Sequence, residues 1–169
     1  MKKLAVLFTA FGVAGCLVQA PIGRRVDTST PERTTPGTAT LEQEVHAQVN
    51  WYRASQGLPP LAFDERIAEV ARSHSSAMAS GKRPFSHEGF EDRAKAIAAF
   101  IHAPRGFAEN VAYDSRSDAR LAELVVQGWI RSAEHRENLE GNYDRTGVGV
   151  AVAPNGWRYF TQIYVQSQR

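Results

Sequence analysis

TGVGVAVAPNGWRYFTQIYVQ (residues 146–166) is the stretch that decides the fold, because its residues alternate regularly in character. Valines recur at every second position of its first half, and the positions between them hold only glycine or alanine. Asn155-Gly156 then marks a tight turn, and β-branched and aromatic residues follow it. A period of two leading into such a turn predicts a β-hairpin. The glycines on one face indicate that a helix, or the functional site itself, packs closely against it.

The segments before the hairpin have the apolar spacing of helices. We expect them at residues 40–57, 64–81, 91–102, from 117 or 118 onward, and 132–141. Thr40, Asp64 and Ser132 are the expected N-caps. Residues 57–64 predict a turn, and residues 107–113 a third strand. Helices early in the chain and strands late in it predict the α+β class.

The first residues of the chain predict an export signal. Met1, Lys2 and Lys3 form a short basic start, and residues 4–15 are apolar but too few to span a bilayer. A buried first helix is the alternative, but such a helix needs an amphipathic stripe, and this run is apolar on all sides.

Cys16 is the only cysteine of the chain and closes the motif VAGC (residues 13–16), which resembles the lipobox of bacterial lipoproteins. A buried thiol or an intermolecular disulfide is the alternative for an odd cysteine. Its position favours acylation after cleavage, and two acyl chains suffice for stable anchoring. We therefore expect a signal at residues 1–15, a flexible tether rich in Pro, Thr and Arg at 16–39, and one domain at 40–169.

The charge balance argues against a nucleic-acid partner. The chain has 20 Lys and Arg against 18 Asp and Glu, and the predicted signal holds two of the lysines and no acidic residue. The predicted mature chain is therefore formally neutral, and its sequence has no basic stripe.

Four motifs precede the hairpin in the chain, in this order: ARSHSSAM (71–78), FSHEGF (85–90), FAENVAY (107–113) and GWIRSAEHREN (128–138). With the hairpin they resemble the CAP superfamily of cysteine-rich secretory, antigen five and pathogenesis-related one proteins, in its compact bacterial branch. The resemblance covers residues 41–168. It implies a three-layer α-β-α sandwich around a small antiparallel sheet, and a cleft whose two histidines and two acidic residues hold a divalent metal, usually zinc.

Carried over residue by residue, the resemblance assigns the metal ligands to His87, Glu109 and His135. The second acidic residue has no clear match: Ser132 stands at the expected spacing, and Glu134 is a candidate substitute. Imidazole and carboxylate are suitable zinc ligands, and two histidines with one glutamate would leave a coordination position open. These residues lie far apart in the sequence, so only the fold can bring them together.

Other polar residues have more than one interpretation. His74 shares an apolar helical stripe and is either a hydrogen-bonded core residue or part of the cleft floor. Gln162, in the closing strand, is a candidate partner for the cleft residues. His46 and His102 have the positions of ordinary surface histidines.

Three functions remain open on the sequence. The preferred one is an exported, membrane-anchored and monomeric protein of the bacterial envelope whose cleft binds a metal and a small ligand, lipid or peptide without turnover. The absence of a matched second acid favours it, because acid–base catalysis usually needs two differently tuned groups. The alternatives are a zinc-assisted hydrolase with Glu109 as base, acting on peptide or cell-wall bonds, and a structural envelope protein whose cleft has no function.

Overall fold

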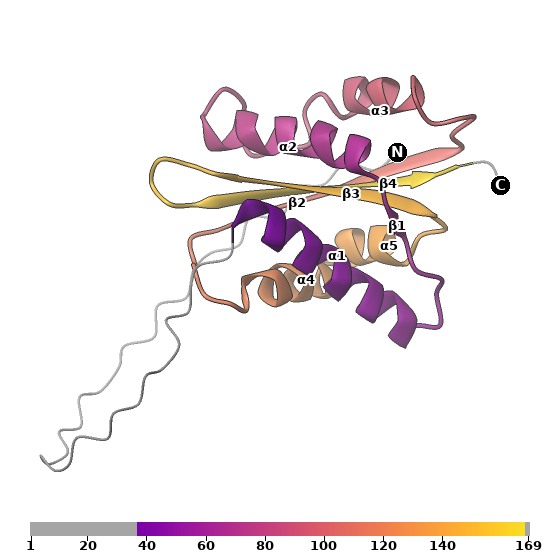
Figure 1. The fold of residues 1–169 in the computed structure, drawn as a ribbon, viewed down its shortest axis with the longest axis horizontal. Helices are drawn as coiled ribbons and strands as arrows, with labels where there is room; N and C mark the ends of the chain where they lie inside the picture. Colours follow the sequence, from indigo (N-terminus) through magenta and orange to yellow (C-terminus); the bar gives the residue numbers. More distant parts are fainter. Residues whose placement is uncertain (1–36, 168–169) are drawn as a thin grey trace, which may run out of the picture.

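The computed structural model describes residues 37–167 and forms three layers (Figure 1). The predicted signal, Cys16 and nearly all of the tether lie outside the described residues. The elements are α1 (Thr38–Ser55), β1 (Ala62–Phe63), α2 (Glu65–Ala79), α3 (Phe90–Ala98), β2 (Gly106–Asp114), α4 (Leu121–Arg131), α5 (Ala133–Glu140), β3 (Arg145–Val152) and β4 (Arg158–Gln166). Helices α2 and α3 cover one face of the sheet, and α1, α4 and α5 the other. The α+β class and the sandwich are confirmed. None of these helices is long and apolar enough to span a membrane.

The sheet has the strand order β1-β3-β4-β2. β3 and β4 form the predicted hairpin, and the predicted third strand is β2, which pairs antiparallel with β4 along its whole length. The long strands form the expected small antiparallel sheet, and the two-residue β1 adds a parallel pairing with β3 through Ala62↔Arg145 and Phe63↔Thr146. Two residues are too few to show a period of two, so this segment had the signature of a turn.

The alternation in the hairpin sets its two faces. Val148 and Val150 point into the core beneath α1, and Gly147 and Gly149 face α2. A Cβ atom at Gly149 would lie 2.1 Å from the backbone nitrogen of Arg72. The glycines therefore allow the backbone of α2 to rest directly on the sheet, so a helix, and not the functional site, explains the glycine face.

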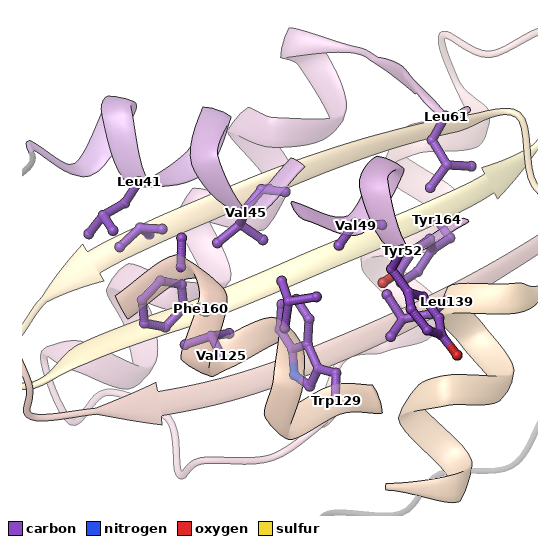
Figure 2. Close-up of a cluster of buried hydrophobic side chains, with 14 of the residues drawn as sticks. Leu41, Val45, Val49, Tyr52, Leu61, Val125, Trp129, Leu139, Phe160 and Tyr164 are labelled. Carbon is purple, nitrogen blue, oxygen red and sulfur yellow. The ribbon is translucent and has the colours of Figure 1, made fainter. Parts of the chain in front are cut away.

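Two apolar clusters hold the layers together. The larger lies between the sheet and α1, α4 and α5 (Figure 2). Its largest fully buried side chains include Leu41, Trp129, Phe160 and Tyr164. The smaller joins α2 and α3 to the other face of the sheet and contains Ile67, Ala71, Ile97, Ile101, Ile163 and Val165. β4 contributes to both clusters, with Phe160 and Tyr164 in the larger one and Ile163 and Val165 in the smaller one, and the burial of its faces fixes its register.

Three helix boundaries differ from the sequence prediction. α1 begins at Thr38 with Gly37 as its cap, so Thr40 lies inside the helix. α3 ends at Ala98 and not at 102, because the chain turns away and reaches a positive φ of 43° at Ala103. α4 begins only at Leu121, since Asp118 accepts a bond from the Arg120 backbone and holds a turn there.

The predicted caps and surface histidines had mixed outcomes. Asp64 is confirmed as the N-cap of α2, with its carboxylate 3.0 Å from the backbone nitrogen of Arg66. Ser132 precedes α5, but its side chain makes no cap bond. His102 is exposed as expected. The surface interpretation of His46 was wrong: this residue is half-buried, with Nε2 2.9 Å from the Leu61 carbonyl and the ring packed against Phe63.

Candidate functional site

The centre of the site is the carboxylate of Glu109, which β2 presents toward the α2–α3 layer. Its Oε1 lies 2.9 Å from Nδ1 of His87, which belongs to the loop between α2 and α3. The side chains are 1% and 10% exposed, respectively. The fold thus brings together two of the three predicted ligands, 22 residues apart in the chain.

Arg93, on α3, is the residue that the sequence analysis missed. Its Nε donates to Glu109 Oε2 at 2.7 Å and its NH2 to Glu109 Oε1 at 2.6 Å. This two-pronged geometry is the strongest form of an arginine–carboxylate pair. In the sequence, Arg93 is one of many charged residues on a short helix, and only its place six residues after His87 distinguishes it. Whether the Arg93 side chain points toward Glu109 depends on how α3 packs over β2.

His135 belongs to α5, which packs on the other side of β2 from the Glu109 carboxylate. It is 4% exposed, and neither ring nitrogen has a hydrogen-bond partner among residues 37–167. Burial lowers the pKa of His135, and the nearby charge of His87 lowers it further. Since a charged ring is disfavoured there, His135 is a neutral imidazole at pH 7, with one donor and one acceptor.

Two asparagines hold the backbone of α5 against β2. Asn110 donates through Nδ2 to the His135 carbonyl at 3.1 Å. Asn138 donates to the Asn110 side-chain oxygen at 2.8 Å and to the Glu109 carbonyl at 3.3 Å. These bonds therefore fix the position of His135 relative to the strand that carries Glu109, although no described residue bonds to the imidazole itself.

His74 lies beneath the loop that carries His87. It is 4% exposed, and its Nε2 lies 2.9 Å from the Ser86 carbonyl. Burial and the charge of Arg93 lower its pKa, and the charge of Glu109 opposes this shift only in part. The geometry agrees with a hydrogen-bonded core residue, one of the two interpretations of the sequence, and His74 also supports the loop next to His87.

The remaining candidates lie away from the carboxylate. Ser132 donates to Glu134 at 3.2 Å, and Glu134 is exposed. Gln162 is fully buried and bonds to Tyr164 and Thr146, on the sheet face opposite Glu109. It lies opposite Asn110 in the sheet and is linked to the Asn110 side chain through the Tyr164 hydroxyl, and Asn110 in turn holds the His135 backbone.

The negative charge of the Glu109 carboxylate is paired with the positive charge of Arg93. Burial opposes ionisation of Glu109, but the hydrogen bonds from His87 and Arg93 outweigh it and lower the pKa of this carboxyl. Glu109 is therefore a carboxylate at pH 7, and Arg93 occupies both of its oxygens. Within residues 37–167, no group of three or more His, Cys, Asp or Glu side chains is arranged to hold a metal ion. In this arrangement the three predicted ligands do not form a metal site, and zinc binding stays a prediction.

Comparison with known proteins agrees with this architecture. YkwD of Bacillus subtilis is 29% identical over 133 residues, which are 77% of this chain and 50% of YkwD. The crystal structure of an extracellular protein containing an SCP domain from Bacillus anthracis superposes with a TM-score of 0.64 and 28% identity, over 77% of this chain and 41% of that one. An outer surface protein of Borrelia burgdorferi has the same TM-score at 15% identity, over 81% of this chain and all of its own, and so shows the fold alone.

The chain thus spans half the length of YkwD and less than half of the Bacillus anthracis protein. Residues 46–164 match the cysteine-rich secretory protein family, CAP, which is well over half of the chain. The matched segment runs from α1 to β4 and includes His87, Arg93, Glu109 and His135. The chain belongs to the CAP family of cysteine-rich secretory proteins.

Proposed function

We propose that this chain is an exported binding protein, which holds a neutral polar group of an extracytoplasmic ligand at His135 and His87 without turning it over. The observation that carries the proposal is the buried imidazole of His135, whose two nitrogens have no partner among the described residues. Leaving a buried polar group unpaired costs about 1–3 kcal/mol. Such a cost is typical of a site that is completed by a ligand.

The chemistry of the histidines favours a hydroxyl or amide group as the part of the ligand that is bound. Neutral His135 offers one donor and one acceptor, which matches groups that can both accept and donate. His87 uses Nδ1 to contact Glu109, so its Nε2 is the nitrogen left for a ligand. The charges of Glu109 and Arg93 cancel, so this pair has no net charge to offer an ionic ligand.

The state of Glu109 favours binding over hydrolysis. A general base needs an oxygen that can reach a proton of the substrate or of a water molecule. Both oxygens of Glu109 accept hydrogen bonds from Arg93, and Oε1 also contacts His87. The low pKa of this carboxyl weakens it further as a base.

The test uses soluble peptidoglycan fragments, which present both hydroxyl and amide groups. The ring signals of His135 and His87 are followed by NMR during titration, in the wild type and in His135→Leu. We expect saturable shifts of both rings in the wild type, and no shift of the His87 ring in the variant, which retains that histidine. We also expect the free energy of unfolding of the variant to equal or exceed that of the wild type. The reason is that leucine replaces two buried nitrogens that have no partner among the described residues.

His102→Leu is the matched control, since it removes an exposed histidine outside the site. It should bind the fragments as the wild type does. If His135→Leu lowers the free energy of unfolding and binds normally, the His135 ring is a structural element and the proposal is wrong. Wild-type ring signals that do not respond to the fragments would contradict the choice of an envelope ligand.

We also propose that Cys16 is acylated and anchors the exported chain to a membrane. The lone cysteine directly after an apolar run supports this, as does the similarity to the extracellular Bacillus anthracis protein. Cys16→Ser should abolish incorporation of labelled fatty acid in a bacterial host and move the protein out of the membrane fraction. Unchanged labelling and fractionation in the variant would refute the anchor.

A further inference from the structure

We infer that the guanidinium of Arg93 is the resident cation of the His87–Glu109 site, and that it excludes a divalent metal for as long as it is present. This inference concerns the charge balance around Glu109 and does not rest on the proposed ligand. It follows from three features: the geometry of the pair, its burial, and the other contacts of Arg93.

Arg93 occupies the carboxylate oxygens of Glu109 to which a metal ion would bind. Arg93 directs two parallel N–H groups at the two carboxylate oxygens, at 2.7 and 2.6 Å. Its side chain is 11% exposed and that of Glu109 is 1% exposed, so solvent screens the pair little. A metal ion at Glu109 would have to displace both of these bonds.

Arg93 is also held in place by the loop that carries His87. NH1 donates to the Glu88 carbonyl at 2.9 Å, and NH2 approaches the His87 carbonyl at 3.4 Å. This loop passes through Gly89, whose φ of 76° is in the left-handed region that favours glycine. Moving the guanidinium away would therefore also release the loop and, with it, the His87 ring.

The charges argue in the same direction. One carboxylate and one guanidinium sum to zero, and a divalent ion would add two positive charges beside a buried arginine. Like charges brought together in a buried site repel one another at a large cost in free energy. His87 and His135 would then be the two predicted ligands left to offset this cost, and two imidazoles are fewer protein ligands than zinc sites normally use.

The decisive experiment removes the cation and retains the histidines. After treatment with a chelator, zinc is titrated by calorimetry into the wild type, Arg93→Gln and Arg93→Lys, and the melting temperature is measured with and without zinc. Arg93→Gln leaves the Glu109 carboxylate without a charged partner, and we expect its zinc affinity to exceed that of the wild type by about tenfold or more. Zinc should raise its melting temperature. Arg93→Lys keeps the positive charge and should gain neither effect.

Two further variants keep the test independent of the folding of Arg93→Gln. In Arg93→Gln/Glu109→Gln, the gain in zinc affinity should disappear, because the unpaired carboxylate is gone. The wild type should bind zinc no more tightly than His87→Ala. Wild-type binding that is stronger than that of His87→Ala, or an equal affinity in the wild type and a folded Arg93→Gln, would overturn the inference. Since the readout is zinc affinity, failure here leaves the binding of peptidoglycan fragments as a separate question.

Discussion

Gly149→Ala should lower the free energy of unfolding by about 3 kcal/mol, which makes it one of the most damaging single-methyl additions in the chain. The new Cβ would lie 2.1 Å from the backbone nitrogen of Arg72 and 2.3 Å from the carbonyl carbon of Ala71. Both atoms belong to the backbone of α2, so no side-chain rotation can relieve the overlap. The helix would have to move away from β3 and would loosen the packing of Ala71 and Ile67 in the smaller apolar cluster.

Urea denaturation of the wild type and the variant, followed by circular dichroism, measures this effect. Gly128→Ala is the matched control, because it adds the same methyl group to α4 at a position with nothing within 4 Å. Alanine is the better helix former, so the control should be about 0.5–1 kcal/mol more stable than the wild type. Equal losses in the two variants would show that α2 does not rest on the glycine face.

Glu42→Ala should lower the free energy of unfolding by about 3 kcal/mol, since it removes a buried carboxylate that bonds to a half-buried arginine and joins three elements. Glu42 is 1% exposed on α1. It accepts from Arg72 Nε at 2.8 Å and from Arg72 NH2 at 2.8 Å. It also accepts from the backbone nitrogen of Val150 on β3, at 3.0 Å. The variant would leave that N–H group buried without its partner and remove the link between α1, α2 and the sheet.

Glu65→Ala provides the comparison, because Glu65 contacts the same arginine at 2.7 Å but its side chain is 69% exposed. Exposed ion pairs contribute between about 0 and 1 kcal/mol. The losses in free energy of unfolding of Glu42→Ala and Glu65→Ala, measured by chemical denaturation, should therefore differ by about 2 kcal/mol or more. Similar losses would mean that the burial of Glu42 does not strengthen its contact with Arg72.

The strongly periodic parts of the chain could be predicted because local sequence alone sets them. The alternation through Val148 and Val150 and the Asn155-Gly156 turn are sufficient for a hairpin. Asp64 caps α2 through a bond that spans only two residues. β1 escaped prediction because its two residues pair with Arg145 and Thr146, some 80 positions further along the chain.

The site was predictable only in part. The ordered motifs identified His87, Glu109 and His135, and the fold does place Glu109 beside His87. They did not reveal Arg93, because a long, flexible side chain on a surface helix has no sequence signal for its direction. They also could not show that the buried His135 ring has no hydrogen-bond partner among residues 37–167, which depends on how α5 lies against β2.

By itself, then, the sequence determined the α+β class, the hairpin, its glycine face and the family, because these depend on short-range periodicity and on motifs in a fixed order. Only the tertiary structure decided which cation contacts Glu109 and which histidine has no hydrogen-bond partner within the described part of the chain. Both outcomes depend on contacts between layers, since α3 and α5 pack against β2 from opposite faces of the sheet. No local pattern in the chain encodes the distances between those layers.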